Sequence, residues 1–466
     1  MRSRNTRRGM AVAAALVSTG LVLSACGGSD DDGDNTEVSG TWPGEGVAEC
    51  EPLAQLADFG DLEGKEVSLY TSIVAPEDQP YKDSFELFTK CTGAKVNYEG
   101  SKEFETQLPV RVESGNPPNI AFIPQPGLLQ SLVQDYPDAV KEAPDSVSEN
   151  VDEFYGADWK AYGTVDDVFY APPLTANVKS FVWYSPKMFK KNGWEIPTTW
   201  DEMIALSDEI ADGGMKPWCA GIGSGEATGW PATDWLEDVL LRTAGPDVYD
   251  DWVNHEIPFN DPAVAEGLDT VGSILKNNDY VNGGFGDFRT IASTEFTDGG
   301  LPILDNECAM HRMASFYAAN WPEGTEIAED GDVFAFYLPA IGEEFGNPVL
   351  GGGEFVTAFS DATEVQALMT YISGGVWVNE KGKATTNGGF VSANKNLDIA
   401  NVASPIDKAS VEILQNPDAV FRFDGSDLMP GPVGAGSFWK EMTAWIGEDQ
   451  STQDTLDNIE NSWPSS

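Results

Sequence analysis

Histidine is scarce in this sequence, and the common catalytic motifs are missing. Only His255 and His311 occur in 466 residues, so a histidine-based catalytic triad is disfavoured. There is no G-x-S-x-G elbow, no Walker-type phosphate loop and no H-E-x-x-H or C-x-x-C pattern. The glycine-rich stretches at 221–225 and 351–353 lack the spacing of a nucleotide-binding fingerprint and indicate turns or hinges. We therefore expect a protein that is not an enzyme, with no cofactor and no metal site.

Basic residues are also few. The chain has 27 Lys and Arg against 76 Asp and Glu, a net charge of −49. Nucleic acid is not expected as a partner, because its phosphates would be repelled. The same repulsion disfavours an anionic ligand and permits a neutral or cationic one. Two carboxylates could serve a glycoside hydrolase. In a chain with 76 acidic residues, however, some pair of carboxylates is expected to lie close together by chance. Most of these residues are explained by a solvated acidic surface.

Long apolar runs are absent apart from one near the start. Residues 10–25 are apolar or small, which is shorter than the roughly 20 residues that cross a bilayer as a helix. Four arginines precede this run, so residues 1–25 are predicted to be a signal peptide. Leu23-Ser24-Ala25-Cys26 resembles the bacterial lipobox. We expect Cys26 to be lipidated and to anchor the protein at the extracellular face of the cell membrane; an ordinary cleavage site with an incidental cysteine is the alternative.

The segment after Cys26 is rich in Gly, Ser and Asp as far as about Gly46. Residues 26–59 are therefore predicted to be a flexible acidic tether that lets the folded body stand off the membrane. Removal of the signal peptide takes four arginines and no acids. It leaves 23 basic residues against 76 acidic ones, a net charge close to −53.

Four cysteines remain beyond Cys26, at positions 50, 91, 219 and 308. An exported chain meets an oxidising environment, where an even number of cysteines usually forms disulfides. Four cysteines allow three pairings. We favour Cys50 with Cys91 and Cys219 with Cys308, because each pair would then stay within one structural half.

The pattern of apolar residues predicts an α/β protein. Strands are expected at 66–70, 95–98 and 119–123, with a helix at 83–90 between the first two. About 400 folded residues exceed one comfortable core, so two domains are expected.

Three later helices carry their own start and stop signals. Thr199-Trp200-Asp201-Glu202 is a capping box, and the helix that it opens ends at Gly213. A second helix opens at Asn260-Asp261-Pro262, with proline at the first helical position. A third runs from Asp361 to Gly374. Their apolar stripes are interpreted as core.

Aromatic residues are abundant, with 14 Trp, 13 Tyr and 23 Phe. Several stand next to Gly, Pro or Asp rather than inside apolar stripes, which is typical of loops. Loop aromatics suit a ligand with C–H faces and a hydroxyl rim, because the ring packs on the face while carboxylates and amides bond the rim. Sugars have this character.

Five segments follow one another along the mature chain in an order that is typical of one protein family: SGNPPNIA at 114–121, FVWYSP at 181–186, PTTWDE at 197–202, ATGWPATDW at 227–235 and SFW at 437–439. Together they resemble the extracellular solute-binding proteins of carbohydrate ABC transporters, of the maltose-binding type and especially its α-glucoside branch. The resemblance covers nearly the whole mature chain.

This resemblance implies a two-lobed α/β fold of the periplasmic-binding-protein type, with discontinuous lobes. Residues 60–172 and 354–404 would form one lobe, and residues 173–353 and 405–466 the other, joined by a hinge of two or three crossing segments. The lobes would close on a ligand in the cleft. The expected partners are a sugar and the permease subunits of an ABC transporter, and the protein is expected to be a monomer.

Site residues carry over only where the local pattern matches. Trp230, in a Gly-Trp-Pro turn, and Trp439, nine residues after Pro430, resemble the family's cleft aromatics and are expected to pack on pyranose faces. Phe316 and Tyr317 follow a predicted strand at 313–315, and either could be core instead. Loop residues at expected strand ends are predicted to bind hydroxyl groups: Asp234, Glu354, Gln125, Glu103 and Asn177. For Glu103 surface solvation competes with this role, and for Glu354 hinge geometry does.

The leading hypothesis is a binding protein that holds an α-glucoside or another oligosaccharide between aromatic rings from both halves of the molecule. Two alternatives stay open. One is a solute-binding protein for a non-sugar such as a cationic polyamine, which the acidic charge permits. The other is a secreted glycoside hydrolase.

Overall fold

The structure, a computed structural model, describes residues 42–284, 286–416 and 418–464. The predicted signal peptide and Cys26 lie outside the described residues. Within the predicted tether, the 3-10 helix η1 (Ala48–Phe59) buries Cys50, Leu53 and Leu56. The tether prediction is wrong for this stretch, because its apolar side chains pack into a core.

The first sheet has the strand order β12-β3-β1-β2. Its strands are β1 (Glu66–Thr71), β2 (Lys95–Gly100), β3 (Ile120–Ile123) and β12 (Phe355–Ala358). β1 pairs in parallel with β2 and β3, and β12 is antiparallel to β3. The strands predicted at 66–70, 95–98 and 119–123 are confirmed. β3 and β12 are buried throughout, as expected where helices cover both faces of a sheet.

Eight helices belong to this part of the chain: α1 (Gln79–Ser84), α2 (Glu86–Thr92), α3 (Phe104–Glu113), α4 (Pro126–Asp135), α5 (Asp145–Phe154), α6 (Ala157–Tyr162), α13 (Thr363–Ser373) and α14 (Gly375–Ala384). The single helix predicted at 83–90 is wrong, because Phe85 ends α1 and starts α2. The helix predicted from Asp361 to Gly374 is confirmed as α13. A short hairpin, β4 (Thr164–Val165) and β5 (Val168–Phe169), follows α6.

The second sheet has the order β10-β7-β9-β8. Its strands are β7 (Phe181–Tyr184), β8 (Lys216–Trp218), β9 (Cys308–Arg312) and β10 (Phe334–Tyr337). Its helices are α7 (Pro186–Asn192), α8 (Trp200–Asp212), α9 (Trp230–Thr243), α10 (Gly245–Val253), α11 (Pro262–Leu275), α12 (Phe296–Gly299), α17 (Trp439–Gly447) and α18 (Thr452–Glu460). The predicted caps are confirmed: the Thr199 hydroxyl accepts from the Glu202 N–H at 3.2 Å, and Asp261 caps α11. The strand predicted at 313–315 is wrong, because β9 ends at Arg312.

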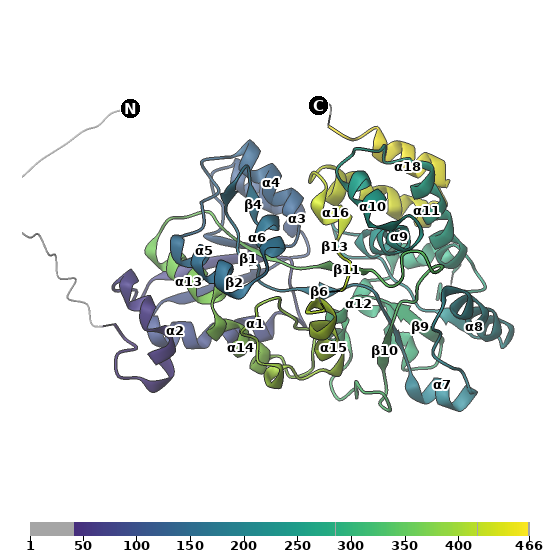
Figure 1. Cartoon of the computed structure of the whole chain (residues 1–466), viewed down its shortest axis with the longest axis horizontal. Helices are drawn as coiled ribbons and strands as arrows, with labels where there is room; N and C mark the ends of the chain where they lie inside the picture. The colour runs from purple at the N-terminus through teal and green to yellow at the C-terminus, as the bar shows by residue number, and fades with distance from the viewer. Residues whose placement is uncertain (1–41, 285, 417, 465–466) are drawn as a thin grey trace, which may run out of the picture. The chain divides into compact units, whose positions relative to one another are not determined.

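A third sheet, of order β13-β11-β6, brings together three segments that are distant in sequence. They are β6 (Asn177–Val178), β11 (Val349–Gly352) and β13 (Phe421–Phe423). In Figure 1 this sheet lies between the first sheet and its helices and the second sheet and its helices. Gly353 is required beside it, because a Cβ there would stand 2.2 Å from the Thr175 carbonyl oxygen. The remaining helices are α15 (Pro405–Leu414) and α16 (Gly425–Leu428).

Separate cores form around the two larger sheets. The core of the first sheet includes Phe88, Phe122 and Trp377, and that of the second includes Trp183 and Trp218. Disulfide bonds join Cys50 to Cys91 in the first core and Cys219 to Cys308 in the second, which confirms the favoured pairing. The α/β class is confirmed, while the predicted lobe boundaries stay a prediction. Among the described residues, no helix combines the length and the apolar character needed to cross a bilayer.

Candidate ligand-binding cavity

Residues from both cores line a cavity of about 370 Å³. From the side of the first sheet come residues 72–77, which follow β1, and Tyr81, Glu105 and Gln125. From the side of the second sheet come Trp230, Phe296, Phe316, Asn320 and Trp439. The crossing segments complete the wall through Thr175, Asn177, Lys179, Gly353 and Glu354. Its volume is in the range of pockets that enclose a small ligand.

Aromatic rings gather mainly on one wall of the cavity. Trp230 packs edge-to-face on Phe296 with ring centroids 5.0 Å apart, and the Phe316 ring lies 6.0 Å away. All three pack against the core of the second sheet. The opposite wall contributes Tyr81 from the first core. Aromatic rings thus come from both sides of the cavity, but most of them stand on one wall, and the facing wall is mostly polar.

Local backbone geometry explains why Trp230 and Trp439 share this wall. Gly229 precedes α9 with φ of 117°, and a Cβ there would lie 2.1 Å from the Trp439 carbonyl oxygen. The turn before Trp230 therefore packs directly on the helix that carries Trp439. A π-helical segment, Val433–Phe438, leads into α17, and the Trp439 indole N–H donates to the Ser426 hydroxyl at 3.2 Å.

Three glutamates face the cavity from the polar side. Partial burial raises the pKa of Glu77, Glu105 and Glu354 to about 7 in each case. The Asn320 side-chain amide donates to Glu77 at 3.1 Å, and the Gln125 amide donates to Glu105 at 3.4 Å. The first of these bonds links the two sides of the cavity. These carboxyl groups can change charge near neutral pH and can accept hydrogen bonds from a ligand.

The cavity also contains amide oxygens without donors. Among the described residues, Gln125 Oε1, Asn177 Oδ1 and Asn320 Oδ1 are buried and accept no hydrogen bond. Gln125 is only 3% exposed and Asn177 only 9%. Buried polar atoms are nearly always paired in folded proteins, so these oxygens at the cavity wall are available to donors from water or from a ligand.

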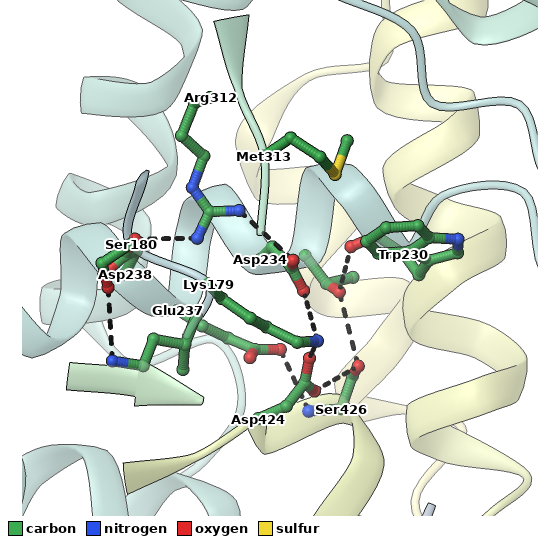
Figure 2. Close-up of polar contacts among 12 residues, drawn as sticks. Lys179, Ser180, Trp230, Asp234, Glu237, Asp238, Arg312, Met313, Asp424 and Ser426 are labelled. Atoms are coloured by element: carbon green, nitrogen blue, oxygen red, sulfur yellow. Dashed lines mark hydrogen bonds and ion pairs between the residues drawn. The ribbon is translucent and has the colours of Figure 1, made fainter. Parts of the chain in front are cut away.

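A buried ionic network lies beneath the cavity (Figure 2). The Lys179 ammonium forms ion pairs with Asp424 and, at 2.9 Å, with Asp234. On the far side of Asp234, the Arg312 guanidinium bonds Asp234 at 3.2 Å and Asp238 at 2.7 Å. Asp238 also pairs with Arg242. Asp234, Asp238 and Asp424 each therefore have a cationic partner inside the protein.

Asp234, Glu237 and Asp424 come close enough to suggest a metal site, since one oxygen of each lies within 4.8 Å of the others. Their oxygens are already occupied. Lys179 bonds Asp234 and Asp424, and the backbone N–H groups of Gly425 and Ser426 donate to Glu237 at 2.9 and 3.0 Å. The arrangement is therefore that of an ion-pair network rather than of a metal centre.

The residues predicted for the site divide into two groups. The cavity is lined by Trp230, Trp439, Phe316, Glu354, Gln125 and Asn177. Asp234, Tyr317 and Glu103 are not among the lining residues. Asp234 points into the network below, Tyr317 is fully buried and donates to the Thr297 carbonyl oxygen, and Glu103 is exposed just before α3. Ligand binding by the lining residues stays a prediction.

Sequence reasoning missed several residues that line the cavity. Glu105 lies two positions after Glu103, and the helical phase of α3 turns Glu105 rather than Glu103 inwards. Asn320 ends the 3-10 helix that carries Phe316, the helix η4 (Ser315–Asn320), and the spacing of four residues does not place both on one face of such a helix. Glu77, Tyr81 and Lys179 carried no comparable signal, because only the fold brings them together.

Comparisons with known proteins point to one family. A family model described as bacterial extracellular solute-binding protein matches residues 72–286. The chain is 40% identical to the osmoprotective compounds-binding protein GgtB of Synechocystis sp. over 87% of its length and 94% of the relative. It is 36% identical to the alpha-glucosides-binding periplasmic protein AglE of Rhizobium meliloti over 87% of its length and 88% of the relative.

Solved structures agree on the fold. The bacterial solute receptor AcbH, described as having an exclusive substrate preference for β-D-galactopyranose, superposes with a TM-score of 0.70 at 20% identity. The match covers 85% of this chain and 97% of the receptor. At this identity the likeness concerns the two-lobed fold alone.

Proposed function

The chain belongs to the bacterial extracellular solute-binding protein family, and we propose that it captures a neutral, hydroxyl-rich sugar in the cavity between its two sides and delivers it to an ABC importer. We propose that it binds its solute without converting it, because both full-length relatives are named as binding proteins. A ligand that contacts both sides of the cavity would favour a closed arrangement of the lobes, because it binds that arrangement more tightly than an open one.

The observation that carries this proposal is the surplus of unpaired acceptors beside aromatic rings. Gln125, Asn177 and Asn320 offer oxygens without donors, while Trp230 and Phe316 offer apolar faces. A sugar supplies both complements, since its hydroxyl groups donate and its C–H faces pack on rings. An anionic solute would instead meet the cavity glutamates and be repelled.

We propose an α-glucoside as the ligand class. Two full-length relatives are named for α-glucosides and for osmoprotective compounds, and both names are compatible with small neutral solutes. The cavity volume of about 370 Å³ favours a small glycoside over a long oligosaccharide.

Calorimetry of the purified protein with maltose, trehalose, sucrose, galactose and spermidine tests the proposal. Trp230→Ala should weaken sugar binding by about 30-fold, the loss expected when a buried aromatic anchor is truncated. The matched control is Trp194→Ala, which removes a ring that packs on Phe189 away from the cavity. Equal affinity in Trp230→Ala and the parent protein would remove Trp230 from the site. Release of monosaccharide from a bound glycoside would identify an enzyme instead.

We also propose that a lipid on Cys26 holds the protein at the extracellular face of the membrane, that it acts as a monomer, and that it docks on permease subunits. The lipobox-like sequence before Cys26 supports the anchor. Cys26→Ser should shift the protein from the membrane fraction to the medium. Retention of this variant in the membrane fraction would contradict a lipid anchor at this cysteine.

A further inference from the structure

The cavity wall carries more acid than base. Two lysines line it, and both are already engaged. Lys179 pairs with Asp234 and Asp424, and Lys102 pairs with Glu295 at 2.5 Å. By contrast, Glu77, Glu105 and Glu354 form no ion pair with any lysine, arginine or histidine in the part of the chain that the structure describes.

One further lysine lies behind the wall and does not cancel this surplus. The Lys381 ammonium donates to the Thr385 hydroxyl at 2.9 Å and lies over the Tyr81 ring, 4.1 Å from its centroid. Burial lowers the pKa of Lys381 to about 7, so at neutral pH it carries only part of a charge. Asp407 lies near Lys381 and is also buried, which raises the pKa of its carboxyl group to about 7.

Aromatic rings stand on the wall that faces these carboxyl groups. Lys179 already shows that the wall tolerates an ammonium, since its Nζ lies 5.7 Å from the centroid of the Trp230 ring. A cation beside a carboxylate and an aromatic face gains from both partners. A hydroxyl group in the same place donates one hydrogen bond and brings no charge.

We infer that the cavity binds a glycoside that bears a protonated amine more tightly than the same glycoside with a hydroxyl group at that position, and that Glu77, Glu105 and Glu354 supply the opposing charge. The inference rests on the proposed sugar-binding function and narrows its ligand class. The unpaired oxygens of Gln125 and Asn177 fit the same ligand, because an ammonium brings three donors and no acceptor.

The test compares maltose and trehalose with their 6-amino-6-deoxy derivatives by calorimetry of the whole protein. At pH 8 we expect at least one amino derivative to bind about tenfold more tightly than its parent sugar. This preference should shrink as the pH falls to 6, because the glutamates take up protons near pH 7 and lose the charge that attracts an ammonium. The other titratable or charged groups that face them are Asp78, Tyr81, Tyr98, Lys179, Lys381 and Asp427.

Single glutamine variants identify the carboxyl group that holds the amine. Glu77→Gln, Glu105→Gln and Glu354→Gln keep the shape of the side chain and remove its charge. At least one of them should abolish the preference for the amino derivative while the parent sugar still binds. Glu103→Gln is the matched control, since Glu103 lies two residues from Glu105, is exposed and does not line the cavity. Glu103→Gln should leave the preference unchanged.

The outcomes separate this inference from the proposed function. Parent sugars that bind as tightly as every amino derivative at pH 8 would overturn the inference and leave the proposed function intact. A preference that persists in all three glutamine variants would also overturn it. No binding of either sugar series would overturn the proposed function itself. Spermidine that binds more tightly than any amino sugar would reassign the cavity to amines without a sugar ring.

Discussion

One group of carboxyl groups lies in the ionic network and another on the cavity wall, and the two groups differ in how their charge is balanced. Below the cavity, Asp234 and Asp238 are fully buried, and each bonds the Arg312 guanidinium. At the cavity wall, Glu77 and Glu354 are only partly buried and lack an ion pair among the described residues. The aspartates are paired with cations inside the protein, whereas the cavity glutamates remain available to a bound solute.

This difference separates structural acids from acids that are available to a ligand. A buried carboxylate that bonds two cations holds secondary-structure elements together, here β9 with α9. A carboxyl group whose neighbours are an amide and a cavity contributes little to folding, but it can accept donors from a solute. In a chain with 76 acidic residues, pairing is therefore a better guide to function than the number of acids.

The sharpest test of this contrast substitutes one residue in the ionic network and one residue at the cavity wall. Arg312→Met should destabilise the fold by about 3–5 kcal/mol, because Asp234 keeps only Lys179 and Asp238 keeps only Arg242, which leaves the buried network one positive charge short. Glu354→Gln should not lower the free energy of unfolding and should raise it, because the amide removes a desolvated charge. Urea unfolding at pH 7.5 measures both. Similar losses for the two variants would remove the distinction between the two groups.

A second test uses pH. The folded state raises the pKa of Glu77, Glu105 and Glu354 from 4.5 to about 7, so it binds their protons more tightly than the unfolded chain does. Their contribution to stability is therefore complete below pH 4.5 and is lost as the pH rises through 7. Each single glutamine variant should lose roughly 2 kcal/mol less than the parent protein between pH 5 and pH 8, and the triple variant should lose several kcal/mol less. Parallel pH profiles would show that these groups titrate normally.

The third test deletes one polar group from each region. In the network, the Ser180 hydroxyl donates to Asp238 at 2.8 Å, and Ser180→Ala should cost about 1–2 kcal/mol of stability. At the cavity, Gln125→Met removes an oxygen that has no donor and one long hydrogen bond to Glu105, at 3.4 Å, so stability should change by less than about 1 kcal/mol. Sugar affinity should instead fall about tenfold in Gln125→Met and hold in Ser180→Ala. Thermal unfolding measures the change in stability, and calorimetry measures the change in sugar affinity.

The fold was largely predictable because its signals are local. Capping residues such as Thr199 and Asp261 fix where helices begin, and the apolar runs at 66–70 and 119–123 identify buried strands. The prediction failed at 48–59, where a disulfide and three buried side chains order a segment that follows a polar stretch. The disulfide partner of Cys50 is Cys91, 41 residues along the chain, so the local sequence does not reveal this packing.

The site was predictable only in part. Trp230 and Trp439 could be proposed from short motifs, because a Gly-Trp-Pro turn and an aromatic pair are visible in the sequence itself. Asp234 was placed in the site because it was expected in a loop at a strand end, whereas it lies inside α9 and bonds into the ionic network. Which of two neighbouring residues faces a cavity depends on helix phase and on distant partners such as Lys179 and Arg312. A residue's position near a strand end determines neither the helix phase nor the distant partners.

The smallest expected effect concerns an ion pair at the cavity mouth. Lys102 bonds Glu295 at 2.5 Å from the opposite side, and both side chains are largely exposed, at 46% and 39%. Solvent screens such a pair, so Lys102→Ala should reduce the free energy of unfolding by no more than about 0.5 kcal/mol. Because the pair joins the two sides of the cavity, its loss should act on the rate of ligand release more than on stability. Stopped-flow tryptophan fluorescence should show faster release in Lys102→Ala, with the difference vanishing at high salt. If release were unchanged at low salt, the pair would have no part in holding the cavity closed, and the buried network with the unpaired glutamates would account for the electrostatics of this site.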